Sequence, residues 1–339
     1  MTQMDASNKC LTGVMIIPTG IGCKLGGHAG FNPGVKLIAS CAKQLIVNPN
    51  ALNASDINEQ PPNVLYVEGS SIDRFLDGEI NLHPTKTYNR ILMVVNDADY
   101  ASHNTMNAGI WGLGADIQLL QLSTPLRMKV GFNEDGTAGG SYSGVHELIE
   151  QVRTLEFEAL AISTAIETDT ETEALYWQHG GVNPWGGIEA IVTKIIATAL
   201  NKPVAHAPVN SELSWYRSLV VDRDMSPEVI SNTYMFCVLK GLHRAPRIMQ
   251  IHHSTARTAL VKEDIDFMIS PHGCWGAPHA ACIRLSIPVI VVRENTTCLS
   301  THDYSYPPTV ILVQTYLEAA GVVQCLGNGI DYRTVLARD

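Results

Sequence analysis

Residues 11–30 read LTGVMIIPTGIGCKLGGHAG, and this stretch decides the fold class. Its first part, Leu11–Pro18, is an apolar run with the length of a strand buried on both faces. The glycine-rich segment Thr19–Gly30 follows directly, and apolar spacing over Pro33–Val47 then predicts a helix. A buried strand followed by a glycine-rich turn and a helix is typical of α/β proteins with parallel sheets.

Similar apolar runs recur along the chain and alternate with helix-like segments. Helices are predicted over Ile188–Leu200 and His279–Leu285. This alternation predicts an α/β fold with one or two mostly parallel sheets and flanking helices, and a parallel, right-handed connection between the last two strands. The further predicted strands are Asn63–Val67, Arg90–Asn96, Ala159–Thr164, Pro203–Ala207, Asp266–Ser270 and Pro288–Arg293.

The length of the chain and one weak segment predict two lobes. The 339 residues exceed the usual size of a single domain. Gly131–Gly144 (GFNEDGTAGGSYSG) is rich in Gly, Ser and acidic residues and is predicted to be a loop. We expect an N-terminal α/β lobe over residues 1–135 and a C-terminal α/β lobe over residues 145–339, with a cleft at the strand carboxyl ends. The alternative is a lid within one domain.

Composition and charge narrow the class of protein and its partners. Hydrophobic residues make up 45% and charged residues 17%, which excludes a disordered chain. Lys and Arg number 23 against 33 Asp and Glu, a formal net charge of −10, so no nucleic-acid partner is expected. Apolar runs stay below the ~18 residues of a membrane span, and Met1–Cys10 has no signal-peptide profile. We therefore expect a cytoplasmic protein without a membrane partner, and a homodimer on base rates.

The glycine-rich segment is the first candidate site. Backbone N–H groups of such a loop can approach an anion closely. The spacing matches neither G-x-G-x-x-G nor G-x-x-x-x-G-K-[ST], so a nucleotide cofactor is not expected. The segment is either a tight turn packed on the sheet or a cradle for a substrate carboxylate or phosphate. The substrate-binding residues predicted from it are Thr19, Gly20, Gly22 and His28.

Polar residues that follow predicted strands form a second set of candidates. Ligands in open parallel sheets bind outside the carboxyl ends of the strands. Asparagines can instead hydrogen-bond their own turn, and Asp97 or Asp99 could cap a helix. The substrate-binding residues predicted on this ground are Asn50, Asn53, Asp97, Glu294, Asn295 and Thr296.

The segment SPHGCWGAPH, Ser270–His279, is the most informative about chemistry, because it lies between a predicted strand and a predicted helix. A thiol near a helix N-terminus and an imidazole becomes a usable base or nucleophile. Cys274 and His272 are therefore predicted to be catalytic, together with His206 at the end of another strand. Each could instead be a buried structural residue. A metal site remains an alternative interpretation. Its ligands would come from His28, His206, His272 and His279, although their spacing matches no zinc signature.

Five segments of the chain are similar to one known family. They are Leu45–Ser55, Val64–Leu76, Gly181–Pro208, Met235–Met249 and Tyr316–Val323. On these segments the chain resembles the domain-of-unknown-function 3326 family over nearly its whole length, and family members have a similar length. The family's activity is unassigned, so the resemblance implies little about function. In the family an acidic residue follows the Gly-Ala-Gly-type loop, whereas here Phe31-Asn32-Pro33 follow, which implies a changed substrate or role if that carboxylate serves the family.

These observations lead to one expected function and two alternatives. We expect an enzyme of small-molecule metabolism that acts on a small polar, carboxylate-bearing substrate by proton transfer next to a carbonyl, of the isomerase or lyase type. The glycine loop with Asn50 and Asn53 would hold the carboxylate, while His206 and Cys274 with His272 would move the proton. The alternatives are a metal-dependent hydrolase or lyase and a non-catalytic metabolite-binding protein. The expected cofactor is none or one divalent metal.

Overall fold

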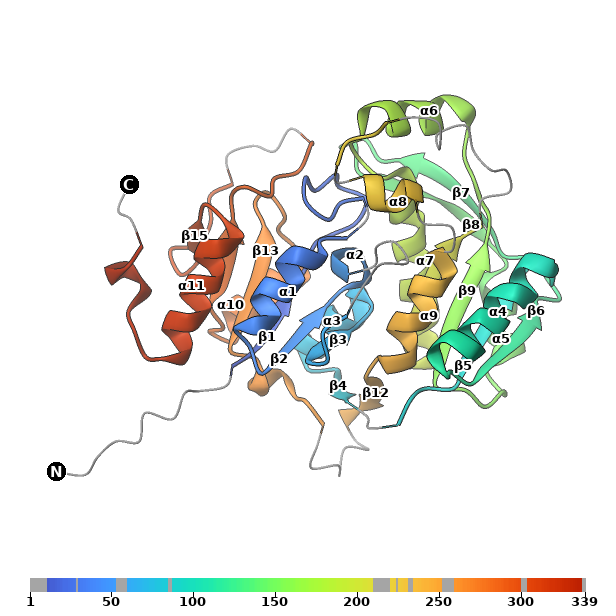
Figure 1. Ribbon diagram of the computed structural model, residues 1–339, viewed down its shortest axis with the longest axis horizontal. Coiled ribbons are helices and arrows are strands. Elements are labelled where there is room, and N and C mark those ends of the chain that lie inside the picture. Colours follow the sequence, from blue (N-terminus) through green and yellow to red (C-terminus); the bar gives the residue numbers. More distant parts are fainter. Residues whose placement is uncertain are drawn as a thin grey trace.

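The computed structural model describes residues 11–28, 30–52, 60–84, 87–209, 220–223, 225–230, 234–251, 259–299 and 304–336. In this part of the chain, two parallel sheets are flanked by helices, which confirms the predicted α/β fold. Figure 1 shows the two units side by side, one built from both ends of the chain and one from its middle.

The larger sheet has six parallel strands in the order β15-β14-β13-β1-β2-β3. Counted along its own strands, this is the order 3-2-1-4-5-6 of doubly wound α/β sheets, in which the order reverses beside the first strand. Here the reversal lies between β1 and β13, where Gly13 is opposite Phe267. The strands are β1 (Thr12–Met15), β2 (Gln44–Val47), β3 (Val64–Tyr66), β13 (Phe267–Pro271), β14 (Val289–Val292) and β15 (Ile311–Val313).

The smaller parallel sheet comes from the chain between β3 and β13. Its four strands have the order β11-β9-β5-β6. The strands are β5 (Ile91–Val95), β6 (Ile117–Gln121), β9 (Ala159–Thr164) and β11 (Val204–Pro208). Two minor sheets accompany it, with the orders β10-β7-β8 and β12-β4. Their strands are β4 (Ile80–His83), β7 (Arg127–Phe132), β8 (Ala138–Ser143), β10 (Ile166–Glu167) and β12 (Arg247–Gln250).

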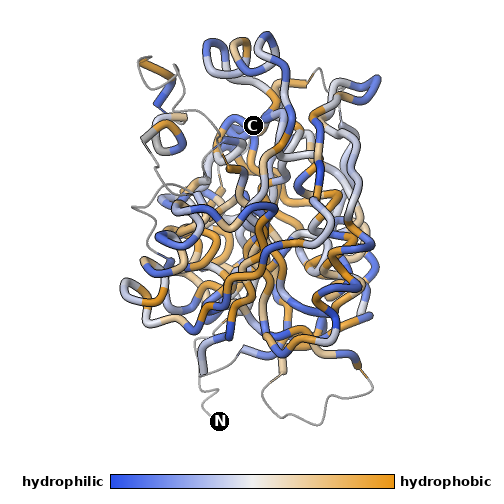
Figure 2. Tube along the Cα trace, turned by 90° about the vertical axis from the view of Figure 1, so that its right-hand side faces the viewer, coloured by the Kyte–Doolittle hydropathy of each residue, from blue (hydrophilic) through white to orange (hydrophobic). Residues whose placement is uncertain are grey.

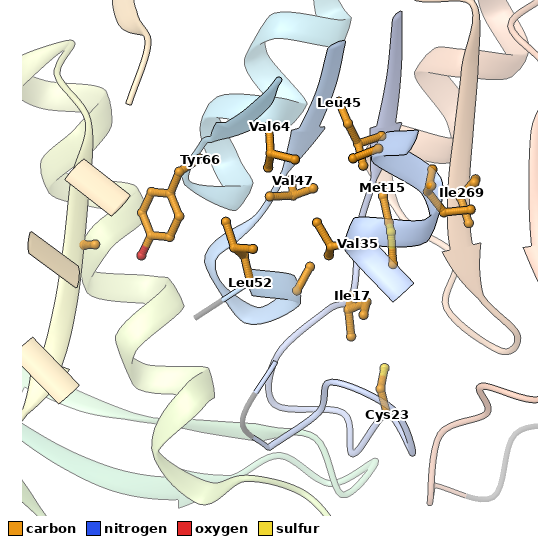
Figure 3. Packing of buried hydrophobic residues seen from close by; sticks show 14 of the residues in the cluster. Met15, Ile17, Cys23, Val35, Leu45, Val47, Leu52, Val64, Tyr66 and Ile269 are labelled. Atoms are coloured by element: carbon orange, nitrogen blue, oxygen red, sulfur yellow. The ribbon is translucent and has the colours of Figure 1, made fainter. Parts of the chain in front are cut away.

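Alternating side chains of the larger sheet pack on two layers of helices, as the period of a strand requires. Met15 and Val47 belong to the cluster that contains Val35 of helix α1 (Asn32–Ser40). Figure 3 shows Met15, Val47 and Leu52 gathered around Val35. Val14 belongs to the cluster on the opposite face. Helix α11 (Tyr316–Gly327) shares the first layer, and helices α3 (Gly69–Asp77) and α10 (Ala277–Arg284) form the second.

The first of these clusters continues into the smaller sheet. It includes Met93 and Ala161 of that sheet and Leu239 of helix α9 (Tyr234–Arg244). A Cβ on Gly241 of α9 would lie 2.7 Å from the ring of Tyr66 on β3, so the glycine permits this contact. Figure 2 shows the hydrophobic segments in the middle of the molecule, with most hydrophilic segments outside. The two sheets thus share one core.

Two of the remaining helices cover the second face of the smaller sheet. Helices α5 (Val145–Val152) and α7 (Pro184–Leu200) pack on the face opposite α9. Asn183 begins α7 by accepting hydrogen bonds from the N–H groups of Trp185 and Gly186, and Pro184 fits the first turn. The other helical segments are α2 (Pro49–Leu52), α4 (Tyr100–Leu113), α6 (Thr170–His179), α8 (Ser226–Ile230) and the 3-10 turns η3 (Lys262–Asp264) and η4 (Tyr332–Thr334).

Two predictions about local structure are wrong. The helix predicted over Pro33–Val47 ends at Ser40, and β2 begins at Gln44, because the residues QLIV pair with β1 and β3 as a strand. The loop predicted over Gly131–Gly144 is largely the antiparallel pair β7–β8, with Phe132 opposite Ala138. The two sheets do not divide the chain there, since β1–β3 and β13–β15 share one sheet.

Candidate functional site

A cavity of about 530 Å³ lies at the carboxyl ends of the central strands of the larger sheet. Residues that follow β1, β2, β3 and β13 form one side of it, and β11 with α7 forms the other. It therefore includes the point between β1 and β13 where the strand order reverses, which is where open α/β sheets bind ligands. Of the residues predicted to form a site, it brings together Thr19, His28, Asn50, His206 and Cys274.

The glycine-rich loop after β1 is held by packing and backbone bonds. Gly20 and Gly22 have φ angles of 72° and 66°, in the left-handed region that favours glycine. The carbonyl of Gly20 accepts a hydrogen bond from Ala138 N–H at 2.7 Å, and a Cβ on Gly22 would meet the Cys298 sulfur. Thr19 lines the cavity, whereas Gly20 and Gly22 do not. The tight-turn interpretation accounts for these two glycines.

The predicted residues Glu294, Asn295 and Thr296 lie outside the described cavity lining and hold other segments in place. The fully buried Asn295 accepts from Leu25 N–H at 2.8 Å and donates to the Leu25 carbonyl at 2.9 Å. The carbonyl of Thr296 accepts from Lys24 N–H, and the Glu294 carboxylate accepts from Tyr316 N–H. The structure thus places them behind the glycine-rich loop.

Asparagines brace the end of β1. Asn48 bonds both the N–H and the carbonyl of Ile17. The amide of Asn50 donates to the carbonyls of Ile17 and Pro18, each at 3.1 Å, and Asn50 also lines the cavity. Asn53 lies outside the described residues.

The predicted residue Asp97 is exposed at the end of β5, outside the described lining. Its neighbour Asp99 caps α4, because its carboxylate accepts from Ser102 N–H at 2.7 Å.

The segment after β13 places Cys274, but not the ring of His272, on the cavity. The buried Cys274 sulfur lies 3.8 Å from the sulfur of Cys23, and contact with Cys274 together with burial raises the pKa of Cys23. His272 lies outside the described lining, and its Nδ1 atom is 3.1 Å from the hydroxyl of Tyr306. The hydrogen-bond partners of the Cys274 sulfur among the described residues are the Cys23 sulfur and the carbonyl oxygen of His272, each at 3.8 Å.

His279 lines the cavity as a neutral ring. Its Nδ1 atom accepts from Gly276 N–H at 3.2 Å, so Nε2–H donates to the Ser270 hydroxyl at 2.8 Å. Burial lowers the pKa of His279 to about 4. It therefore acts here as a neutral structural group.

His206 on β11 has a carboxylate partner that the sequence did not reveal. Its Nδ1 atom lies 2.7 Å from Oε1 of Glu189 on α7, and its Nε2 atom lies 3.1 Å from Oγ1 of Thr164. The same Nε2 atom lies 3.2 Å from the carbonyl oxygen of Thr164, so both ring nitrogens have partners within the protein. The His206 side chain is 0% exposed and that of Glu189 is 23% exposed, so the carboxylate is the more accessible partner.

A second carboxyl group, Glu228 of α8, closes the cavity. Oε2 of Glu228 accepts from the Tyr176 hydroxyl at 3.1 Å, and that hydroxyl lies 2.9 Å from Nδ1 of His28. Burial raises the pKa of Glu228 to about 8; the bond from Tyr176 lowers it in part, and repulsion from Glu189 adds to the rise. Glu228 is thus protonated over much of the neutral range.

A third carboxyl group, Asp73 of α3, also lines the cavity. Burial and repulsion from Glu68 raise the pKa of Asp73 to about 6, against the attraction of Lys194. Glu68 itself begins α3, and its carboxylate accepts from the N–H groups of Ser70 and Ser71. Nothing local in the sequence marks Lys194 as the neighbour of Asp73.

The histidines proposed as metal ligands have separate partners. His28 contacts Tyr176, His206 contacts Glu189, His272 contacts Tyr306 and His279 contacts Ser270. Among the described residues, no three His, Cys, Asp or Glu side chains come together as metal ligands do. The ligand set behind the metal alternative is therefore not assembled in this part of the chain.

The arrangement can hold and move protons. Raised carboxyl pKa values near neutrality are the property that general acid–base groups need. The candidates that sequence reasoning missed, Glu189 and Glu228, come from helices far apart in the chain. His206 could be found from the sequence because it is an imidazole near the end of a predicted strand. A glutamate within a helical pattern carries no comparable indication of a site.

Comparison with known proteins identifies a family and one relative. The chain matches the family described as "Protein of unknown function (DUF3326)" over residues 12–336. It is 32% identical to an uncharacterized lipoprotein of Synechococcus sp., over 95% of this chain and 92% of the relative. No solved structure matches the chain.

The relative corrects the predicted location. Its name, a lipoprotein, points to attachment to a membrane, and the expectation of a cytoplasmic protein is wrong on this evidence. The prediction used apolar runs and the first ten residues, and attachment through a lipid requires no spanning helix. Within the described residues, no helix has both the length and the apolar character to cross a membrane. The match over residues 12–336 shows that the chain belongs to the DUF3326 family, as its sequence segments suggested.

Proposed function

We propose that the protein is an enzyme that binds a small polar molecule in this cavity and catalyses proton transfer on it, of the isomerase or lyase type. The observation that carries the proposal is the convergence of Glu189, Glu228 and Asp73 on a cavity at the reversal of the strand order. Such a position is the usual ligand site of an open parallel sheet.

The roles follow from the environment of each group. Glu189 is the base, because its carboxylate is accessible and His206 fixes its orientation at 2.7 Å. Glu228 is the acid, because a carboxyl group with a pKa of about 8 carries a proton at neutral pH. His206 is a positioning residue, and Cys274 forms part of the wall.

Deuterium exchange tests the proposal. The protein is incubated in deuterated water with a set of small polar amines, sugars and hydroxy acids, and loss of carbon-bound proton signals is followed by NMR. We expect exchange on at least one compound, lowered 100-fold or more in Glu189→Gln, since removal of a general base costs about this much. Glu147→Gln, an exposed acid on α5 outside the lining, is the matched control.

A second candidate is a membrane-attached binding protein without catalytic activity. The name of the lipoprotein relative favours it, together with a cavity that two α/β units enclose. Binding of a compound without deuterium exchange, and with recovery of the protein in the membrane fraction, would support this candidate and contradict the enzymatic one.

A further inference from the structure

Acidic side chains strongly outnumber basic ones in the lining of the cavity. Its described lining contains four carboxyl groups and one lysine, with no arginine. The carboxyl groups are Glu68, Asp73, Glu189 and Glu228, and the lysine is Lys194. A ligand with its own carboxylate would have to enter a space of predominantly negative charge, which costs free energy because like charges repel at short range.

Two of the four carboxyl groups are already compensated. The Glu68 carboxylate accepts hydrogen bonds from the backbone and the hydroxyl groups of Ser70 and Ser71. Asp73 is attracted by Lys194. The carboxyl groups without such compensation are therefore Glu189 and Glu228.

Glu189 and Glu228 each have one oxygen available to a ligand. Oε1 of Glu189 is bonded to His206, and Oε2 of Glu228 is bonded to Tyr176. Within the described part of the chain, the other oxygen of each carboxyl group has no hydrogen-bond partner. Glu189 and Glu228 line the same cavity, and the charge of Glu189 adds to the rise in the pKa of Glu228.

An alkylammonium group fits this pair. It has donors for both open oxygens, and its positive charge would replace the repulsion by two charge-assisted hydrogen bonds. Aromatic residues complete the surroundings, since Trp185, Tyr234 and Trp275 line the same cavity. The Trp185 ring is fixed by a hydrogen bond from Nε1 to Thr168 at 2.7 Å, and aromatic faces attract cations.

We infer that the ligand of this cavity is a small organic amine, bound as its ammonium form by Glu189 and Glu228, and not the carboxylate-bearing metabolite expected from the glycine-rich loop. The inference rests on the proposed function in so far as it takes this cavity to be the functional site. It specifies the substrate class. Because a bound ammonium group favours the ionised form of Glu228, an amine substrate would remove the role of acid from Glu228 and leave Glu189 as the proposed base.

Three probes that share a skeleton test the inference. They are 3-amino-1,2-propanediol, glycerol and glycerate, which carry a positive, no and a negative charge. Binding to the whole chain is measured by saturation-transfer NMR at pH 7 in 0.15 M NaCl, which screens non-specific attraction to an acidic protein. We expect the amine to bind at least tenfold more tightly than glycerol, in roughly the millimolar range for a molecule of this size.

The variants Glu189→Gln and Glu228→Gln are each expected to weaken amine binding fivefold or more, while Glu147→Gln leaves it unchanged. Glycerate binding as tight as amine binding, equal weakening by Glu147→Gln, or no amine binding at about 10 mM would overturn the inference.

A measurement on the unmodified protein guards against variants that fail to fold. Calorimetric titration of the amine in two buffers of different ionisation enthalpy gives the protons released on binding. We expect net release, because the ammonium favours the ionised form of Glu228; the absence of release contradicts the inference.

The two hypotheses fail in distinguishable ways. Amine binding without deuterium exchange on any compound would remove the proposed reaction and keep the ligand class. Exchange on a carboxylate-bearing compound, without preference for the amine probe, would keep the proposed reaction and remove the amine as the ligand class.

Discussion

Nδ1 of His206 lies 2.7 Å from Oε1 of Glu189, and this contact joins the edge strand of the smaller sheet to α7 at the cavity. The imidazole is buried between this carboxylate and Thr164, so both of its nitrogens have partners inside the protein. Removal of His206 is therefore expected to lower the stability of the fold as well as to affect the proposed reaction.

The substitution His206→Leu is expected to lower the free energy of unfolding by roughly 1 to 3 kcal/mol, because it leaves Glu189 and Thr164 without their buried partner. Urea unfolding at pH 7 measures the change. His103→Leu, at an exposed position of α4, is the control and should stay within about 0.5 kcal/mol of the unmodified protein. Equal stability of the two variants would show that the His206 contacts contribute little.

The raised pKa of Glu228 predicts that the stability of the protein depends on pH. The pKa of this carboxyl group is raised from 4.5 to about 8, so the folded state retains a proton that the unfolded state loses as the pH rises. Stability from this group is fully present below pH 4.5 and is lost as the pH rises through 8.

Relative to Glu228→Gln, the unmodified protein should thus lose roughly 1 to 4 kcal/mol of its free energy of unfolding between pH 5 and pH 8. One pKa unit corresponds to about 1.4 kcal/mol, and partial exposure of the side chain reduces the effect of the whole pKa shift. Urea unfolding at several pH values measures it. A pH-independent difference between the two proteins would contradict the raised pKa.

Asn295 predicts that the glycine-rich loop depends on a residue outside the cavity. Asn295→Ala removes the bonds to both backbone groups of Leu25 and should lower the free energy of unfolding by roughly 2 to 4 kcal/mol. Asn107→Ala, exposed on α4, is the matched control. Amide hydrogen exchange should increase at Lys24 and Leu25 in the Asn295 variant alone; an unchanged pattern would argue against this support.

Two helical glycines predict opposite effects of the same substitution. A Cβ on Gly187 of α7 would lie 2.1 Å from the carbonyl oxygen of Ala138, whereas Gly321 of α11 has open space. Gly321→Ala should stabilise the protein by up to about 1 kcal/mol through helix propensity. Gly187→Ala should destabilise it by more than that, because two backbones must separate. Thermal unfolding compares them, and a stabilised Gly187→Ala would refute the close approach of α7 and β8.

Much of the fold could be predicted from local patterns. The runs that became β1, β5, β9 and β13 are mostly apolar, since both faces of these strands are buried, and such runs stand out in a sequence. The strand β2 was missed because its four residues continue the helical spacing of the preceding segment. The division into lobes was harder, because the pairing of β1 with β13 depends on packing across the molecule and leaves no local signal.

The candidate site was predictable only where a strand end marked it. Thr19, Asn50 and Cys274 follow strands and His206 lies within β11, and all four line the cavity. Asn295 satisfies the same rule, yet its amide is used by the neighbouring loop. Glu189 and Glu228 lie on helices, where a glutamate is indistinguishable from a solvated residue until the tertiary structure brings the two together.

The pairing of the first and last parts of the chain has a consequence for how the protein is made. Thr12 N–H donates to the carboxylate of Asp266, 254 positions later. The central strand β1 therefore cannot pair with β13 until most of the chain has been synthesised. The smaller sheet needs only residues 91–208 and can form first. Because non-local pairing slows folding, this order of events leaves the edge of β1 that faces β13 unpaired during synthesis, and we expect the larger sheet to be completed last.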